Sequence, residues 1–372
     1  MRILQIAPLW ERVPPRAYGG TEAVVHTLVE ELVRRGHEVT LCASGDSLTS
    51  ARLQACYPRS LRQADDLQYK AIYSWQHAPL SLKEAGGYDL IHNHAGEEVM
   101  ALSHFAPDVP MLNTMHCLIT PDTKFIWDRY DGYYNTISWN QRRNMPELDG
   151  GIFAGVVHNA IDVPSFPFDD AKDDYLLYLA RISPEKGPHL AVEVARRTGR
   201  RLIMAGKVDH LDYNFFVTAV APLIDGDQVI FAGEADGPAK RALYRKARCL
   251  LMPIMWDEPF GLVLAEAQAC GTPVVTFRRG AAPEIVLHGR TGFVVEDVEQ
   301  MAQAVEHLDE IDPAACRAHA EMNFDAPVMA ENYLKVYESI LNQRVSIPSR
   351  QRLPVTSATM NATPEATSSQ VA

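Results

Sequence analysis

Two glutamates, Glu258 and Glu266, stand eight positions apart around the predicted start of a helix. Apolar residues 250–254 predict a buried strand before them, and residues 262–269 have the pattern of a short helix. Glu258 therefore lies in the loop that leads into the helix, and Glu266 lies about one turn inside it. A carboxylate repels phosphate but accepts hydrogen bonds from a vicinal diol, such as that of ribose or a hexose. The pair predicts a site that holds the hydroxyl groups of sugars.

The start of the same helix offers a second binding element. The backbone N–H groups of Phe260, Gly261 and Leu262 have no helical partners and can bind oxygen atoms of a ligand. Carboxylates for sugar hydroxyls and free N–H groups for other ligand oxygens, side by side, indicate a nucleotide sugar as the ligand.

This segment resembles the Glu-x7-Glu motif of the retaining, family 4 type glycosyltransferases, and the resemblance extends to about Leu341. Pro-Phe-Gly inside the motif and Cys-Gly-Thr-Pro-Val-Val after it carry the resemblance. It implies that Glu266 holds the ribose hydroxyls of the donor, while Glu258 and the N–H groups of residues 260–262 address the donor sugar. Taken alone, two glutamates at this spacing would more often be a loop charge and a solvated helix face.

Arg181 and Lys186 form another candidate group, in the segment Arg-Ile-Ser-Pro-Glu-Lys-Gly that follows a predicted strand. Two fixed cations at a strand end can bind a diphosphate and match the charge that grows on it as a glycosidic bond breaks. By the resemblance, these side chains grip the donor diphosphate and act in catalysis. The alternative interpretation is a surface ion pair between Arg181 and Glu185.

The loop after the first strand contains Gly19 and Gly20, which allow the backbone to approach a ligand closely. The resemblance places this loop at the donor phosphates or the acceptor. Thr21 is expected to cap the following helix, and Glu22 to be an ordinary charge in its first turn.

His116 ends another apolar strand. The resemblance implies that this histidine touches the donor sugar near the reacting carbon, although Cys117 follows it where the family usually has glycine. The alternative is a half-buried histidine bonded to a backbone carbonyl group.

Apolar strands alternate with amphipathic helices in both halves of the chain. This alternation predicts parallel sheets covered on both faces. Two such series predict an α/β protein of two Rossmann-like domains facing across a cleft, the GT-B architecture, with ligands beyond the carboxyl ends of the strands. Strands are predicted at residues 3–9, 38–43, 89–92, 111–115, 133–137 and 156–158, then at 175–180, 202–205, 229–232, 249–253 and 274–277.

We predict a first domain at residues 1–165 on the acceptor side and a nucleotide-sugar-binding domain at residues 166–323. A helix at residues 324–344 should return to the first domain, and residues 345–372 should be a disordered tail. Two prolines followed by aspartates mark the linker between the domains. The tail lacks aromatic residues and is rich in Ser, Thr, Pro, Gln and Ala.

The composition excludes several classes of protein. A chain of 372 residues is too long for one typical domain, and 47% hydrophobic and 22% charged residues are ordinary for a soluble globular protein. The net charge of −12 argues against nucleic acid as a partner. No apolar run suits a signal peptide or a membrane span. Six cysteines without Cys-x-x-Cys spacing predict buried free thiols. We therefore expect a cytoplasmic protein, either free or held peripherally at the inner face of a membrane.

Several other groups of residues are candidate sites. His92 and His94 point to one side of a predicted strand, but no carboxylate or cysteine of metal-site spacing accompanies them, so no metal is predicted. The basic helix that contains Lys240 is expected to present a solvated charged face. Residues 233–235 before it are a candidate backbone ledge for a nucleobase, and Glu284 is expected to support the site.

We therefore predict a transferase of carbohydrate or glycolipid biosynthesis that moves a hexose from a nucleotide diphosphate sugar to a hydroxyl acceptor, such as a sugar or a lipid-linked sugar. The resemblance implies retention at the anomeric carbon, with no enzyme nucleophile, essential metal or other cofactor. Three alternatives stay open: a glycoside hydrolase that uses the two glutamates, a sugar-nucleotide epimerase on the same fold, and a non-catalytic nucleotide-sugar-binding protein. A hydrolase would have no use for a diphosphate clamp.

Overall fold

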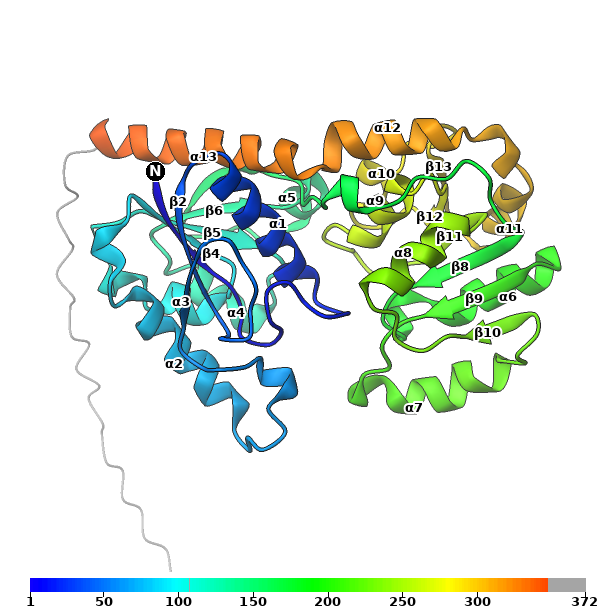
Figure 1. Cartoon of the computed structure of the whole chain (residues 1–372), viewed down its shortest axis with the longest axis horizontal. Coiled ribbons are helices and arrows are strands. Elements are labelled where there is room, and N and C mark those ends of the chain that lie inside the picture. Colours follow the sequence, from blue (N-terminus) through cyan, green and yellow to red (C-terminus); the bar gives the residue numbers. More distant parts are fainter. Residues whose placement is uncertain (107, 347–372) are drawn as a thin grey trace, which may run out of the picture.

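The computed structural model describes residues 1–106 and 108–346. In this part of the chain, two α/β halves stand side by side, and two consecutive helices run along one edge of both (Figure 1). The predicted disordered tail, residues 345–372, lies almost entirely outside the described residues.

The first half is built on a seven-stranded parallel sheet with the order β3-β2-β1-β4-β5-β6-β7. β1 lies between β2 and β4, and this reversal of strand order opens a crevice beyond the carboxyl ends of these strands. The strands are β1 (Arg2–Ile6), β2 (Glu38–Ala43), β3 (Arg52–Ala55), β4 (Leu90–Asn93), β5 (Met111–Met115), β6 (Tyr133–Thr136) and β7 (Ile152–Val156).

The second half repeats this plan with a six-stranded parallel sheet in the order β10-β9-β8-β11-β12-β13. Its central strands are apolar throughout, as is usual for a parallel sheet covered by helices on both faces. The strands are β8 (Tyr175–Leu179), β9 (Arg201–Ala205), β10 (Val229–Phe231), β11 (Cys249–Met252), β12 (Val274–Phe277) and β13 (Gly292–Val295).

Helices cover both faces of each sheet (Figure 1). Those of the first half are α1 (Gly20–Arg34), α2 (Lys70–Leu82), α3 (Glu97–Ala101), α4 (Pro121–Trp127) and α5 (Trp139–Asn144). Those that follow β8 are α6 (Pro188–Thr198), α7 (Tyr213–Phe215), α8 (Gly237–Lys246), α9 (Leu262–Ala269), α10 (Ala282–Ile285), α11 (Val298–Glu306), α12 (Pro313–Phe324) and α13 (Ala326–Ser346).

The chain passes between the halves twice at one place, which we call the hinge (residues 160–166 and 324–327). The N–H of Ile161 donates to the carbonyl oxygen of Phe324 at 2.9 Å, and the N–H of Ala326 donates back to Ile161 at 3.0 Å. After the hinge, α13 packs on α1 and buries Tyr333 and Tyr337 in the core of the first half. The hinge is therefore braced by backbone hydrogen bonds and by a long helix.

The predicted α/β architecture is confirmed. Near the site the predicted and observed elements agree closely, since α9 and β12 have the predicted bounds. Four local predictions were wrong. The strand predicted at residues 156–158 lies four residues earlier in β7, and α1 begins at Gly20 with Gly19 in the cap position rather than Thr21. The edge strands β3, which is half-exposed, and β13 were both missed.

Four cysteines are buried as predicted, but Cys117 is exposed and Cys56 is half-buried; all six are free thiols. Among the described helices, none combines the length and apolar composition needed to cross a membrane.

Candidate functional site

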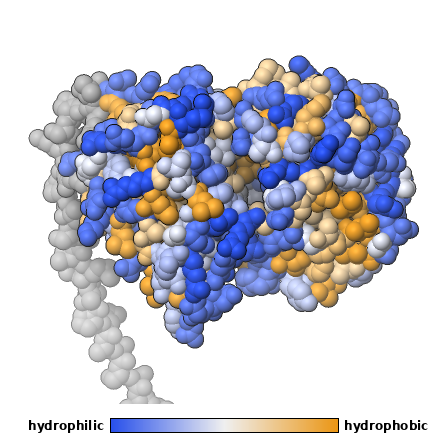
Figure 2. Space-filling model, viewed as in Figure 1, coloured by the Kyte–Doolittle hydropathy of each residue, from blue (hydrophilic) through white to orange (hydrophobic). Residues whose placement is uncertain are grey.

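A cavity of about 880 Å³ lies between the two halves. The first half contributes the loop before α1 and one face of that helix along its length. The second half contributes the carboxyl ends of β8 and β9 and parts of α8 and α9, and the hinge closes one side. Hydrophilic side chains gather along the boundary between the halves (Figure 2). The volume is that of a pocket for a small molecule.

Five of the ten predicted site residues line this cavity: Gly19, Gly20, Arg181, Leu262 and Glu266. The other five do not belong to its wall: His116, Lys186, Glu258, Phe260 and Gly261. The two groups are close in space, since the charges of both Arg181 and Glu258 act on the pKa of Tyr18 in the cavity wall.

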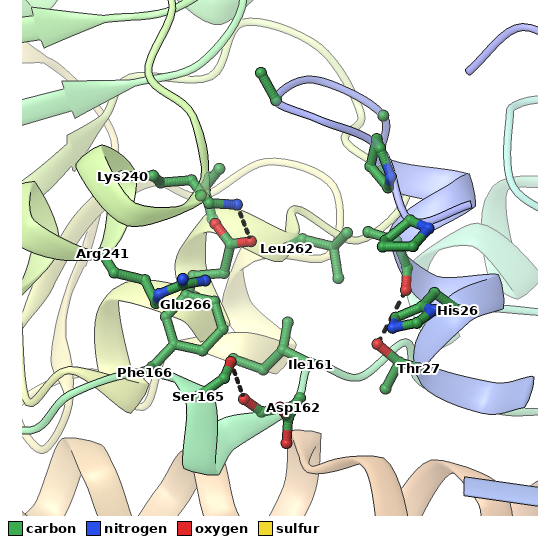
Figure 3. A pocket seen from close by; sticks show the side chains of 18 of the residues that line it. His26, Thr27, Ile161, Asp162, Ser165, Phe166, Lys240, Arg241, Leu262 and Glu266 are labelled. Atoms are coloured by element: carbon green, nitrogen blue, oxygen red, sulfur yellow. Dashed lines mark hydrogen bonds and ion pairs between the residues drawn. The ribbon is translucent and has the colours of Figure 1, made fainter. Parts of the chain in front are cut away.

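Glu266 projects into the cavity from α9 and is only 6% exposed (Figure 3). Its Oε2 accepts a hydrogen bond from the hydroxyl of Tyr244 at 2.9 Å, and its Oε1 accepts one from Nζ of Lys240 at 2.5 Å. Both donors lie on α8, four residues apart, and therefore share a face of that helix. Each carboxylate oxygen can accept more than one hydrogen bond, so a diol can still bind here.

Arg181 follows β8 directly and lies in the cavity wall. It forms ion pairs with Glu185 and, at 3.3 Å, with Asp212, so the ion pair of the alternative interpretation does exist. Nε of Arg181 is buried and has no hydrogen-bond partner among the described residues. A guanidinium group has five N–H donors, and the only hydrogen bond that Arg181 makes with them to a described residue goes to Glu185, so its terminal nitrogens keep donors that a ligand can use.

Lys186 and Glu258 form an ion pair with each other next to the cavity. Nε1 of Trp256 also donates to Oε2 of Glu258 at 2.8 Å, and the ammonium group of Lys186 lies 5.1 Å from the centre of the Trp256 ring. The two predicted catalytic residues are thus held together, with their side chains 14% and 13% exposed.

The start of α9 has the backbone arrangement expected from the sequence. Gly261, at the N-cap, has a φ of 89°, which favours glycine. The N–H groups of Phe260, Gly261 and Leu262 make no hydrogen bond within the described part of the chain. The Phe260 ring itself is buried and packs edge-on against Phe324 at 5.7 Å. Only its backbone can therefore serve a ligand.

The glycine loop of the first half meets this helix start across the cleft. A Cβ atom on Gly20 would lie 3.6 Å from a methyl group of Leu262, and a Cβ atom on Gly19 would lie 2.7 Å from Pro15. The two predicted backbone elements, one from each half, are thus brought together at the cavity.

His116 lies at the carboxyl end of β5, and Nε2 of its ring is 2.8 Å from Nδ1 of His94. Burial lowers the pKa of His116 to about 4, so the ring is neutral at physiological pH. The alternative of a bond to a backbone carbonyl does not hold, because His94 is its hydrogen-bond partner.

Further contacts join the halves beside the cavity. Arg62 of the first half pairs with Glu11 at 2.6 Å and with Glu234 of the second half at 3.0 Å. Glu284 of the second half accepts hydrogen bonds from the N–H of Trp139 at 2.9 Å and from Nε2 of His158 at 3.0 Å. Glu284 therefore binds the start of α5 and holds the two halves together.

Two predictions about charged residues were wrong. Lys240 does not lie on a solvated face, because it pairs with Glu266 in the cavity wall. Glu22 is not an ordinary helix charge, because it is 5% exposed and burial raises its pKa to about 7. For Lys240, the available signal in the sequence was its spacing of four residues from Tyr244 on one helix. For Glu22 the sequence offered no signal, because the loop that covers this residue is irregular.

In the described residues, no group of three or more His, Cys, Asp and Glu side chains is arranged to hold a metal ion.

Two family models match the chain, one on each half. The model described as Glycosyltransferase Family 4 matches residues 18–150, and the model described as Glycosyl transferases group 1 matches residues 165–316. Glycogen synthase of Mycobacterium tuberculosis is 28% identical, and the match covers 95% of this chain and 98% of that protein. D-inositol 3-phosphate glycosyltransferase of Acidothermus cellulolyticus is also 28% identical, with 71% of this chain and 70% of that protein covered.

Solved structures share the two-domain fold. AviGT4, a glycosyltransferase involved in avilamycin A biosynthesis, has a TM-score of 0.72 at 25% identity and covers 92% of this chain and 98% of its own. Sucrose-phosphate synthase of Thermosynechococcus elongatus reaches 0.74 at 19% identity, with coverages of 92% and 100%. Anabaena HepE in complex with UDP-glucose reaches 0.67 at 17% identity, with coverages of 93% and 100%. The chain therefore belongs to the family 4 type of glycosyltransferases, with the GT-B architecture.

Proposed function

We propose that this glycosyltransferase moves a hexose from a nucleotide diphosphate sugar to a hydroxyl acceptor with retention at the anomeric carbon. One observation carries the proposal: a single cavity is lined by the carboxylate of Glu266, the guanidinium group of Arg181 and, one from each half, the glycine loop and the start of α9. A nucleoside, a diphosphate and a sugar need these three kinds of contact in sequence.

In this proposal Glu266 accepts hydrogen bonds from the ribose hydroxyls, and the ammonium group of Lys240 moves aside or shares the carboxylate. Arg181 binds the diphosphate with its terminal N–H groups, and Lys186 joins it by exchanging Glu258 for a phosphate oxygen. The phosphate oxygen is charged, as is the carboxylate that it replaces, so the largely buried ammonium group keeps a charged partner. Glu258, released from Lys186, can accept a hydroxyl of the donor sugar.

Retention follows in the proposal from attack by the acceptor on the same face that the diphosphate leaves. The departing phosphate oxygen takes the acceptor proton, while Arg181 and Lys186 stabilise the charge on the leaving group. Neither an enzyme nucleophile nor a metal ion takes part. The groups gathered at the site, which are cations and sugar-binding carboxylates, suit this route better than acid–base hydrolysis.

The comparisons support the donor class. The Anabaena structure holds UDP-glucose, and the relative from Mycobacterium tuberculosis is named glycogen synthase. UDP-glucose is a hexose on a nucleoside diphosphate, the class of donor that the groups gathered here suit. The contacts of the base at residues 233–235 and of the acceptor in the first half remain part of the proposal.

Calorimetric titration with UDP-, GDP- and ADP-linked glucose and mannose tests this proposal. We expect one nucleotide class to bind the wild type, and Glu266→Ala and Arg181→Ala each to weaken that binding by at least about tenfold, as expected for loss of a charged hydrogen bond. Glu193→Ala and Arg197→Ala are matched controls, because these residues form an exposed ion pair on α6, outside the cavity wall.

Binding of no nucleotide sugar, or equal binding by the site and control variants, would contradict the proposal. The donor that binds is then incubated without acceptor. Appearance of an epimer would favour the epimerase alternative instead.

A further inference from the structure

A continuous chain of hydrogen bonds connects His116 at the cleft with α13, the helix that begins at the hinge. We call it the His116 chain. It runs below the carboxyl ends of β1, β4, β5 and β6, and all its members except His116 are buried. Its members, in order from the cleft, are His116, His94, Gln5, Tyr337, His92, Thr114 and Asn135.

The direction of each hydrogen bond can be worked out from the far end. Nδ2 of Asn135 donates to the backbone carbonyl of Thr136 at 3.3 Å, which fixes the orientation of the amide because a carbonyl can only accept. Oδ1 of Asn135 therefore accepts the single hydroxyl proton of Thr114, at 2.7 Å. With that proton used, Oγ1 of Thr114 can only accept from Nε2–H of His92, at 2.6 Å.

The next links follow from the neutrality of His92. Burial lowers its pKa well below the usual value, so one ring nitrogen carries the proton and the other accepts. Nδ1 of His92 therefore accepts the hydroxyl proton of Tyr337, at 2.6 Å. The oxygen of Tyr337 is then an acceptor for Nε2 of Gln5, at 3.2 Å. This orients the amide of Gln5 with its carbonyl oxygen toward His94.

The same reasoning gives the direction of the remaining hydrogen bonds, up to His116. Nε2–H of His94 donates to Oε1 of Gln5 at 2.9 Å, which leaves Nδ1 of His94 as an acceptor, because burial also keeps this ring neutral. Nε2–H of His116 donates to that nitrogen at 2.8 Å. Since the ring of His116 is neutral as well, its Nδ1 carries a lone pair and no proton.

This lone pair is available to a ligand. Nδ1 of His116 has no hydrogen-bond partner among the described residues and is not one of their buried unpaired atoms. His116 ends β5 at the carboxyl edge of the sheet, where ligands of such sheets bind. The next residue, Cys117, is close enough to Glu258 for that carboxylate to help raise its pKa. The ring thus lies near the predicted sugar-binding glutamate.

We propose that Tyr337, Gln5 and His94 are positioning residues that hold His116 in its Nε2–H tautomer, so that Nδ1 accepts a hydrogen bond from a hydroxyl group of the sugar in the cleft. The assignment of the tautomer follows from the hydrogen-bond chain and does not depend on the proposed function, whereas the sugar contact rests on that proposed function. A reversed chain would present an N–H group at the same point and would reject a hydroxyl that must donate. The sugar contact thus depends on the seating of α13, the helix that follows the hinge.

Nitrogen-15 NMR of the full chain with labelled histidine tests the tautomer, since the two ring nitrogens give different shifts when protonated and unprotonated. The His116→Asn spectrum identifies the signals of His116. We expect the Nε2–H tautomer in the wild type. In Tyr337→Phe the fixed acceptor for Gln5 is lost, the amide can turn over, and we expect His116 to show a mixture of both tautomers.

Tyr333→Phe is the matched control. Tyr333 is also a buried tyrosine of α13, and its hydroxyl lies 3.1 Å from Thr114 and 3.4 Å from Nδ2 of Asn135, but no link between Asn135 and His116 passes through it. This variant should keep the wild-type tautomer. If Tyr337→Phe does not fold, Gln5→Met breaks the same chain one link closer to His116 and gives the same readout.

Activity provides the second readout. Tyr337→Phe should lower kcat in proportion to the fraction of His116 that keeps the Nε2–H tautomer, which is about twofold for an equal mixture. It should leave the affinity for the nucleoside diphosphate unchanged, because Tyr337 does not line the cavity in which those contacts are proposed. A structural defect would instead weaken both.

The outcomes separate the two proposals. A proton on Nδ1 of His116 in the wild type, or a single unchanged tautomer in Tyr337→Phe, overturns the positioning role whatever the enzyme binds. Equal kcat in Tyr337→Phe and the wild type overturns the contact with the sugar. Failure of every nucleotide sugar to bind overturns the proposed function and leaves the tautomer result standing.

Discussion

Glu266 receives hydrogen bonds on both oxygens from side chains that the sequence places 22 and 26 residues away. A buried carboxylate left without donors would be costly, so these partners prepare the site before any ligand arrives. Tyr244 is fully buried and keeps the carboxylate oriented, whereas Lys240 lies in the cavity wall on a flexible stem. A ribose diol can therefore replace the lysine without disturbing the tyrosine.

Glu22, in contrast to Glu266, is a buried carboxyl group that is poorly supplied with hydrogen-bond donors. It lies in the first turn of α1 and accepts only one long hydrogen bond, 3.4 Å from the N–H of Glu11. Burial raises its pKa to about 7 from 4.5. The folded protein therefore holds a proton on Glu22 between these two pH values, while the unfolded chain has lost it.

The pH dependence of Glu22→Gln follows from this difference. For the wild-type carboxyl group, stability is full below pH 4.5 and is lost as the pH rises toward and through 7, because deprotonation is easier in the unfolded state. Glutamine does not titrate. We expect the variant to match the wild type near pH 5 and to be more stable near pH 8, by on the order of 2 kcal/mol. Urea unfolding at both pH values measures this, and an equal difference at the two values would contradict it.

A site residue could be predicted where the neighbouring sequence shows its surroundings, and was misjudged where its partners lie on another element. Arg181 was placed in the cavity wall because it directly follows a buried apolar strand, and Glu266 because the Glu-x7-Glu motif spans the loop after β11 and the first turns of α9. The role of Glu22 was missed because its environment is set by the irregular loop that carries Glu11. Lys240 was misjudged because its partner lies on another helix, and a charge run on one helix does not show which neighbour it faces.

At the scale of the element, α9 is prepared for ligand binding by its first residues. Its N-cap, Gly261, has a φ of 89°, and the N–H groups at the start have no partners in the described part of the chain. A Cβ atom added at Gly261 would lie 3.2 Å from Leu264 and 3.4 Å from Glu258. This glycine therefore holds both the direction of α9 and the loop that carries Glu258.

Gly261→Ala should lower the stability by about 1 kcal/mol, the cost of alanine at positive φ, and should also weaken donor binding. Gly36→Ala is the matched control, because Gly36 has a similar φ of 83° with open space around it and lies after α1, away from the cavity. We expect similar losses of stability in both variants by urea unfolding. Only Gly261→Ala should raise the donor Kd; an equal donor Kd in both would show that the helix start does not serve the ligand.

The elements themselves were largely predictable because most strands of a parallel sheet are apolar throughout. β12 and α9 were predicted with their observed bounds, whereas the edge strands β3 and β13 were missed. β3 has exposed ends and lacks the apolar signature, and β13 has only four residues. The strand at β7 was displaced because β7 is only partly buried throughout, whereas Val157 just after it is buried. Local patterns therefore identify the centre of a sheet better than its edges.

At the scale of the whole molecule, the cleft has contacts of two kinds. On one side, Glu284 accepts backbone N–H groups of α5, and the hinge is braced by backbone hydrogen bonds. On the other, Arg62 bridges Glu11 and Glu234 with its side chain 26% exposed. Backbone hydrogen bonds are insensitive to salt, while a partly exposed ion pair is screened. The first set is suited to act as a pivot and the second as a latch.

Glu234→Ala removes the half of this latch that crosses the cleft and leaves Arg62 paired with Glu11. A partly exposed ion pair is worth about 0.5–1 kcal/mol, so the ratio of closed to open molecules without donor should fall about two- to fivefold. Energy transfer between dyes on the two halves measures this ratio. Raising the salt from about 0.05 to about 0.5 M should open the wild type more than the variant, which keeps the Arg143–Glu284 ion pair between the halves. Glu299→Ala, which removes an exposed ion pair within the second half, should behave as the wild type does. An equal response to salt in Glu234→Ala and Glu299→Ala would mean that the bridge does not govern closure, and that the pivot alone sets the distance between the halves.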